Sequence, residues 1–230
     1  RIFFLADGIR AGMTDKELHE LSAIDPWFLN QVREIVETED KLRGNPLSAF
    51  TKSDMLFLKR KGFSDGRLAQ LTGAKEAEVR AARLAMGIRP VYKRVDTCAA
   101  EFDAQTPYFY ASADARCEAR TFPRSGKPVV MVLGSGPIRI GQGIEFDYSS
   151  VHCVWTLKAM GYDVVIVNNN PETVSTDFDT GDRLYFDPLN PESVDNIIAT
   201  EKPDACVVQF GGQTAIKLAK HMDEIGLPIL

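Results

Sequence analysis

Apolar positions repeat with two different periods along the chain. Over residues 1–86 they recur every three or four positions, as in Phe28, Val32 and Val36, which is the spacing of an amphipathic helix. Beyond that region, short apolar runs without alternation appear, and residues 129–133 are one of them. Such a run is typical of a strand buried on both faces of a parallel sheet. The pattern predicts a helical region followed by an α/β region.

Two helix starts in the first region carry recognisable caps. In Asp25-Pro26 the aspartate can accept hydrogen bonds from free backbone donors, and proline fits the first helical turn. Thr14 and Glu17 have the spacing of a capping box. Both sites predict helices that begin immediately afterwards.

The helical region also contains a weak internal repeat. The segment GMTD at 12–15 is similar to GFSD at 62–65, and the leucines that follow each segment match in spacing. We therefore expect two similar helix pairs about fifty residues apart.

In the second region, strands alternate with helices at short range. Strands are predicted at 129–133, 163–167, 183–186 and 205–209, with helices between and after them. This alternation indicates a Rossmann-like, doubly wound parallel sheet with helices on both faces. The expected organisation is a helical domain at 1–121, a linker at 122–128 and the α/β domain at 129–230. Residues 89–124 are less periodic and are interpreted as an extended segment that leads into the linker.

Composition excludes several classes of protein. The 230 residues are 44% hydrophobic and 26% charged, with a formal net charge of −5, which favours neither nucleic acid nor an anionic membrane as a partner. No apolar run approaches the roughly 20 residues of a membrane span, and no signal peptide is evident. We expect a cytoplasmic protein. Both ends look cut, so the chain is interpreted as a piece of a longer protein.

Cysteine and histidine spacing argues against metal or nucleophilic chemistry. The four cysteines form no Cys-x-x-Cys pair, and the three histidines are scattered without triad partners. Free thiols and no metal site are therefore the expectations.

The loop after the first α/β strand is rich in glycine, which is typical of phosphate binding. Gly134 and Gly136 fit a dinucleotide fingerprint, but Arg139 occupies the place of its third glycine. The acid expected after the second strand is replaced by an asparagine run at 168–170, and no Gly-Lys-Ser/Thr is present. Dinucleotide and P-loop sites are thus excluded. A glycine turn that only joins strand to helix remains an alternative.

Two glutamates change the interpretation of this loop. Glu145 lies near the start of the following helix, and Glu172 lies in the loop after the next strand. Loops at the carboxyl ends of parallel strands converge on one crevice, although a lone glutamate at a helix start is often only a cap. We expect a lined cavity there, with Arg139, Asn170 and Gln213 as further residues of the crevice loops.

A DNA-binding module is a weaker alternative. Residues 65–83 resemble a helix-turn-helix, but the second helix begins KEAE at 75–78 and mixes acids with bases. Binding to DNA phosphates needs a basic face. Trp27 and Phe28 are better explained as core or subunit contacts.

Three long motifs carry a family resemblance. GSGPIRIGQGIEFDY at 134–148, NPETVSTD at 170–177 and VQFGGQT at 208–214 resemble the large chain of carbamoyl-phosphate synthase. PVYKRVD at 90–96 and FDAQTPY at 102–108 extend the resemblance upstream. It implies a helical oligomerisation domain, followed by the pre-ATP-grasp domain that opens the second half of an internally duplicated large chain.

The resemblance also implies an activity and partners. The family is an ATP-dependent ligase that makes carbamoyl phosphate from bicarbonate, two ATP and ammonia supplied by a glutaminase small subunit. Its product serves arginine and pyrimidine synthesis. In the family, ATP and Mg²⁺ are bound by ATP-grasp domains that lie outside this chain. We therefore expect no cofactor, no catalytic residue and no synthase activity in the chain alone. Homo-oligomers should form through the helical domain.

In that family, residues matching Gly143, Glu145 and Glu172 line a tunnel for carbamate. Carbamate is unstable in water, so a closed path prevents its hydrolysis. The resemblance implies that Gly143 leaves room, while the glutamates hydrogen-bond carbamic acid if it travels protonated; charged glutamates would repel the anion. The protonation state stays open.

Two other functions remain as alternatives. One is another ATP-grasp ligase with a similar leading domain, such as a carboxylase component. The other is a non-catalytic helical assembly module attached to an α/β domain. The helical domain placed before the sheet favours the synthase.

Overall fold

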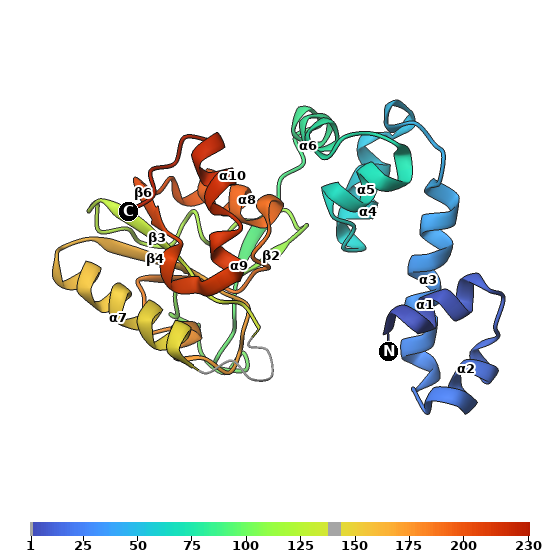
Figure 1. Ribbon diagram of the computed structural model, residues 1–230, viewed down its shortest axis with the longest axis horizontal. Helices are drawn as coiled ribbons and strands as arrows, with labels where there is room; N and C mark the ends of the chain where they lie inside the picture. Colours follow the sequence, from blue (N-terminus) through green and yellow to red (C-terminus); the bar gives the residue numbers. More distant parts are fainter. Residues whose placement is uncertain (1, 138–143) are drawn as a thin grey trace. The chain divides into compact units, whose positions relative to one another are not determined.

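The computed structural model describes residues 2–137 and 144–230. Its contacts divide the chain into two compact units, Arg1–Ile88 and Arg89–Leu230. The first unit is coloured blue to teal in Figure 1 and the second green to red. Each is described by itself below.

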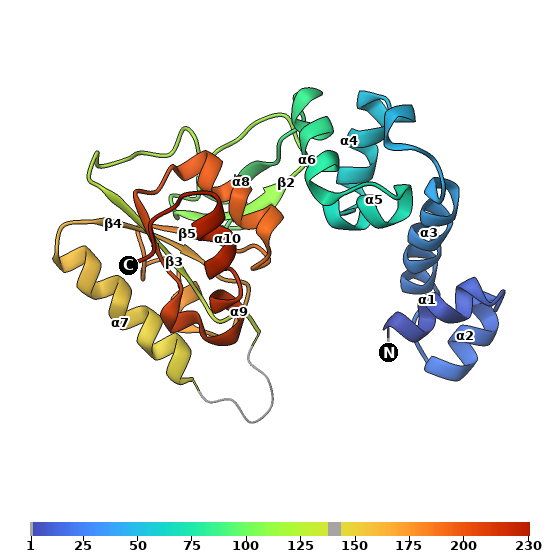
Figure 2. The same ribbon diagram turned by 45° about the horizontal axis from the view of Figure 1, so that its top comes forward.

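The first unit is helical, as its apolar period predicts. Its α-helices are α1 (Ile2–Arg10), α2 (Asp15–Ser22), α3 (Pro26–Leu42), α4 (Lys52–Arg60), α5 (Asp65–Thr72) and α6 (Glu76–Ala85). A 3₁₀ turn, η1 (Leu47–Ala49), precedes α4. In Figure 2, α3 is the long helix against which α1 and α2 pack.

The predicted repeat is present in three dimensions. Helices α1 to α3 form one half and α4 to α6 the other, and each half has its own apolar core. Gly12 and Gly62 take the same left-handed φ of 89° between the first two helices of each half. Thr14 and Ser64 then cap the second helices through their side chains. The predicted caps at Thr14 and Asp25 are both formed.

Each half also contains an arginine–aspartate ion pair at equivalent positions. In the first half Arg33 binds Asp15 at 2.6 Å, and the two side chains are 25% and 37% exposed. Fifty positions later Arg83 binds Asp65, also at 2.6 Å, but both side chains are only 1% exposed. Lys59 adds a second cation 3.0 Å from Asp65. The repeat thus holds one pair near water and the other inside the protein.

Trp27 and Phe28 lie outside the core of this unit. Their exposed fractions are 62% and 58%, and their rings pack edge to face on each other. Ile2, Phe3 and Phe4 on α1 are exposed as well. Of the two roles expected for Trp27 and Phe28, burial in this core is therefore wrong.

The second unit is a six-stranded sheet in the order β1-β2-β5-β4-β3-β6. The strands are β1 (Val91–Arg94), β2 (Tyr108–Ser112), β3 (Val129–Leu133), β4 (Asp163–Val167), β5 (Arg183–Tyr185) and β6 (Ala205–Val207). All neighbours pair in parallel except β1 and β2. The predicted strands at 129, 163, 183 and 205 are therefore confirmed, the last two being shorter than expected.

Helices cover both faces of the sheet, which confirms the doubly wound fold. The helices are α7 (Glu145–Ala159), α8 (Pro191–Glu201), α9 (Gly212–Ile216) and α10 (Ala219–Glu224), with 3₁₀ turns η2 (Val174–Thr176) and η3 (Gln209–Gly211). Val154 of α7 packs on one side, against Val130 and Ile166. Helices α8 to α10 pack on the other side, against Met131 and Val165. Figure 1 shows α7 separated from α8, α9 and α10 by the strands.

The segment 89–121 belongs to the sheet unit in the structure. The expected helical domain extended to residue 121, whereas the contacts of the helical unit end at Ile88. Strand β2 pairs with β5, and Tyr92 and Phe109 are buried against the ring of Tyr185. These contacts join residues far apart in sequence, so the local period of the segment did not reveal them.

Candidate functional site

The site lies where the carboxyl ends of β3 and β6 meet. Strand β3 is followed in space by β4 and β5 on one side, and β6 lies on its other side. The connections after β3 and β6 therefore leave in opposite directions, and crevices form at such switch points. Two residues expected here, Arg139 and Gly143, lie outside the described residues.

Glycines let the loops at this edge approach closely. A Cβ on Gly134 would come within 2.5 Å of the side-chain carbon Cγ of Asn168. A Cβ on Gly211 would come within 2.4 Å of the Leu133 carbonyl oxygen. Both distances are shorter than any carbon side chain tolerates. Gly134 and Gly211 therefore allow these loops to pack closely.

Asn168 ties the loop after β3 to the loop after β4. It is buried, and its Oδ1 accepts hydrogen bonds from the backbone N–H groups of Gly136 and Asn169, both at 2.9 Å. Its Nδ2 donates to Ser175 Oγ at 2.9 Å. This asparagine occupies the position where a dinucleotide site needs an acid, and here it holds two loops together.

Asp147 links the helix start that carries Glu145 to the loop that carries Glu172, at the carboxyl edge of the sheet. Glu145 begins α7 and Glu172 lies in the loop after β4, and both side chains are exposed. Between them, the buried carboxylate of Asp147 accepts hydrogen bonds from the backbone N–H groups of Val174, at 2.9 Å, and Ser175, at 3.3 Å. The start of α7 is thereby fastened to the loop that carries Glu172. Sequence analysis missed Asp147, although its place in the first turn was a signal.

The other two described residues expected at the crevice differ in exposure: Asn170 is buried and Gln213 is exposed. Asn170 is buried, its Oδ1 accepts from the Glu172 N–H at 3.0 Å, and its carbonyl accepts from Thr176 Oγ1 at 2.7 Å. Gln213 is exposed in α9. Asn170 shapes the loop, and Gln213 is free to reach solvent or a ligand.

Asp187 is a buried acid at the same edge that sequence analysis did not identify. It follows β5 by two residues and is only 7% exposed. Burial raises the pKa of its carboxyl group to about 7. Its signal in the sequence was an acid after a strand, the same placement that drew attention to Glu172.

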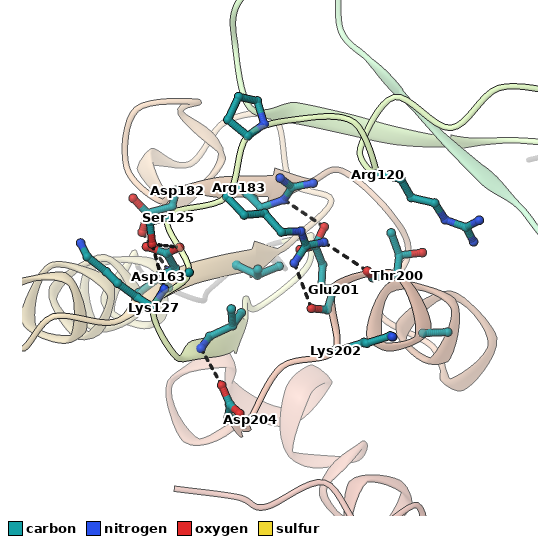
Figure 3. Close-up of a pocket in the computed structure, with 17 residues that line it drawn as sticks. Arg120, Ser125, Lys127, Asp163, Asp182, Arg183, Thr200, Glu201, Lys202 and Asp204 are labelled. Carbon is teal, nitrogen blue, oxygen red and sulfur yellow. Dashed lines mark hydrogen bonds and ion pairs between the residues drawn. The ribbon is translucent and has the colours of Figure 1, made fainter.

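A pocket of about 910 Å³ lies at the opposite, amino edge of the sheet (Figure 3). Buried Glu201 binds Arg183 at 2.9 Å and Arg124 at 2.9 Å, and also accepts from the Tyr185 hydroxyl. Burial, together with the charge of Glu201, raises the pKa of Tyr185. Asp204 accepts from the Val129 N–H at 2.8 Å. These carboxylates therefore stabilise the start of the strands.

Metal-ligating clusters, cysteine pairs and membrane-spanning helices were also sought among the described residues. No group of three or more His, Cys, Asp and Glu side chains gathers there as a metal site. The four cysteines are unpaired. Within 2–137 and 144–230, no helix has the length and apolar character to cross a bilayer.

Comparison with known proteins assigns both units. Residues 126–230 match the family described as the carbamoyl phosphate synthase preATP-grasp domain, and residues 1–87 match the carbamoyl-phosphate synthetase large chain, oligomerisation domain. The chain belongs to the carbamoyl phosphate synthase large-chain family. Its site is therefore the carboxyl edge of a preATP-grasp domain.

Relatives in this family match the whole chain. The carbamoyl phosphate synthase large chain of Halomonas eurihalina is 54% identical over 230 residues, which are 100% of this chain and 21% of the relative. The large chain of Thermus thermophilus is 51% identical over 230 residues, again 100% of this chain and 22% of the relative. The chain thus spans about a fifth of the length of the relatives it matches.

Proposed function

We propose that this chain is the assembly and tunnel-wall portion of a glutamine-dependent carbamoyl phosphate synthase large chain. In this proposal the complete enzyme joins bicarbonate to ammonia from a glutaminase small subunit, with two ATP, in the cytoplasm. The product serves arginine and pyrimidine synthesis. The observation that carries the proposal is that the whole of this chain, its helical unit together with its α/β unit, matches one continuous part of such large chains.

The carboxyl edge supports a role in carrying carbamate. Asp147 and Asn168 fasten the loops of Glu145 and Glu172 into one edge, so both exposed carboxylates border the same region. A closed protein wall keeps water from a labile intermediate. We propose that Glu145 and Glu172, with Gly143, line the path, and that Arg139, Asn170 and Gln213 shape the loops around it.

The helical unit is proposed to assemble copies of the chain. Ile2, Phe3, Phe4, Trp27 and Phe28 are large apolar residues that this unit leaves exposed. Apolar patches of this kind mark protein–protein contacts. The matched oligomerisation domain has the same bounds as this unit, to within one residue.

Blocking the proposed path should uncouple the two half-reactions. In the complete enzyme, we expect Glu172→Trp to lower glutamine-dependent carbamoyl phosphate synthesis by about an order of magnitude, because bulk at the wall displaces the intermediate. Bicarbonate-dependent ATP hydrolysis should continue. The measurement is ATP consumed per carbamoyl phosphate formed.

A matched control is Glu224→Trp, which places the same bulk on an exposed glutamate at the end of α10. This variant should keep the wild-type ratio. A Glu172→Trp enzyme with unchanged synthesis and unchanged coupling contradicts the tunnel assignment.

The chain of 230 residues is expected to lack synthase activity and tight ATP binding. We propose that ATP and Mg²⁺ are held by ATP-grasp domains elsewhere in the large chain, so phosphoryl transfer requires those parts. Calorimetric titration of the chain with Mg-ATP should show no tight binding. Saturable binding with a 1:1 stoichiometry would refute this expectation.

A further inference from the structure

Two buried oxygen atoms at the carboxyl edge have no hydrogen-bond partner. Among the residues that the structure describes, nothing binds Oδ2 of Asp187 or Oδ1 of Asn169. The two residues come from neighbouring parallel strands, β5 and β4, whose last paired positions are Tyr185 and Val167. Asp187 and Asn169 each lie two residues beyond those positions. Since side chains alternate along a strand, continuing this register puts both residues on one side of the edge.

The neighbouring Asn168 shows that the fold can satisfy a polar group here. Its oxygen and its nitrogen both have partners within hydrogen-bonding distance. One residue later, the oxygen of Asn169 has none among the described residues. Leaving a buried polar atom unpaired is costly to a folded protein. Two such atoms, just beyond the ends of adjacent strands, are therefore available as acceptors for a ligand.

Gly136 lies close to the side chain of Asn169. Its φ of +68° is a conformation that favours glycine. A Cβ added there would come within 3.4 Å of Asn169 Oδ1 and of Thr214 Cγ2, and within 3.5 Å of Leu189 Cδ1. A larger residue at this position would therefore crowd the amide of Asn169.

We propose that Asp187 and Asn169 form a hydrogen-bonding subsite for a small planar molecule that carries N–H donors beside a carboxyl group. Carbamate belongs to this chemical class, and the inference rests on the proposed function. An uncharged Asp187 donates its O–H to a ligand oxygen and accepts a ligand N–H on its other oxygen. Asn169 Oδ1 accepts the second N–H. The subsite holds the molecule in transit; no bond forms or breaks.

Burial of Asp187 favours its uncharged form, because a buried carboxylate loses its hydration. This loss raises the pKa of Asp187 to about 7. Asp187 therefore donates a hydrogen bond below about pH 7 and loses that ability above it.

The test uses the complete large chain with its glutaminase subunit. Asp187→Leu removes both hydrogen bonds at similar size, and Asp187→Asn keeps a donor and an acceptor that cannot ionise. ATP consumed per carbamoyl phosphate formed is measured from pH 6.5 to 8.5. We expect the ratio to rise at least threefold in Asp187→Leu. In the wild type we expect the ratio to increase above pH 7. In Asp187→Asn it should stay near the wild-type value at pH 6.5 and lack that increase.

Asp179→Asn is the matched control, because Asp179 is an exposed acid in the segment between β4 and β5. It should follow the wild-type profile. If Asp187→Asn also follows the wild-type profile, or if both Asp187 variants lose stability without a change in coupling, the subsite is refuted. Where Asp187→Leu fails to fold, the pH profile of Asp187→Asn decides alone.

Failure of the subsite and failure of the proposed function have different signatures. A wild-type enzyme that makes no carbamoyl phosphate overturns the function itself. A wild-type enzyme that is active and is uncoupled by Glu172→Trp, but not by either Asp187 variant, overturns only the subsite.

Discussion

Replacing Arg83 by methionine should lower the free energy of unfolding of the helical unit by about 3–5 kcal/mol, the cost of breaking a buried ion pair on one side. Arg83 donates to Asp65 Oδ2 at 2.6 Å, to Asp65 Oδ1 at 3.0 Å and to the Ile88 carbonyl at 3.1 Å. Methionine keeps most of the volume but removes the paired hydrogen bonds to Asp65, whereas Lys59 stays 3.0 Å from the carboxylate. Denaturant titration followed by circular dichroism measures the loss.

The repeat supplies a matched control for this prediction. Arg33→Met removes the equivalent arginine, whose pair with Asp15 is partly exposed. Partly exposed pairs contribute about 0–1 kcal/mol, and the hydrogen bond from Arg33 to the Met13 carbonyl adds about 1 kcal/mol at most. Equal losses from both substitutions would show that burial of the second pair is not what makes it important.

The Arg83–Asp65 pair also determines how the stability of the helical unit depends on pH. Burial acts to raise the pKa of Asp65, but the hydrogen bonds from Arg83 and the charge of Lys59 outweigh it, and the pKa lies below its ordinary value of 3.8. A lowered carboxyl pKa contributes stability above the unfolded pKa and loses it as pH falls through the folded value. The difference between wild type and Arg83→Met should therefore shrink below about pH 4.

Gly211→Ala should destabilise the α/β unit by about 3 kcal/mol or more, because the new methyl group overlaps backbone atoms in a packed core. The added Cβ would lie 2.4 Å from the Leu133 carbonyl oxygen and 2.5 Å from that of Gly134. Neither oxygen can move without shifting the end of β3. Thermal unfolding of the chain, with coupling measured in the complete enzyme, tests the expectation.

Gly66→Ala is the control for Gly211→Ala, and it should stabilise the helical unit instead of destabilising its own unit. In α5 the added Cβ would meet only the carboxylate of Glu76, at 3.2 Å, and that flexible side chain can turn away. Alanine in a helix is favoured over glycine by up to about 1 kcal/mol. If the free energy of unfolding of Gly211→Ala lies within about 0.5 kcal/mol of the wild-type value, the loops after β3 and β6 separate easily and the prediction is wrong.

Much of the site could be anticipated from the sequence, because it depends on where polar residues follow strands. Glu145 and Glu172 were identified in this way, and the structure places both near the carboxyl edge. Asp147 and Asp187 were not, since their places in a first helical turn and after a strand are shared by many solvated acids. The role of Asn168 was equally hidden, because its partners lie on a different loop.

The sequence by itself determined the helices of the first unit, their caps, the fifty-residue repeat and the parallel strands. Each of these depends on hydrogen bonds and apolar spacing among residues close together in the chain. Only the tertiary structure decided that residues 89–121 join the sheet, that one of two equivalent ion pairs is buried, and that Asp187 is enclosed. These outcomes depend on burial by segments that are distant in sequence. The free energy of a charged or aromatic side chain depends more on whether it is buried than on which residues lie next to it in the chain.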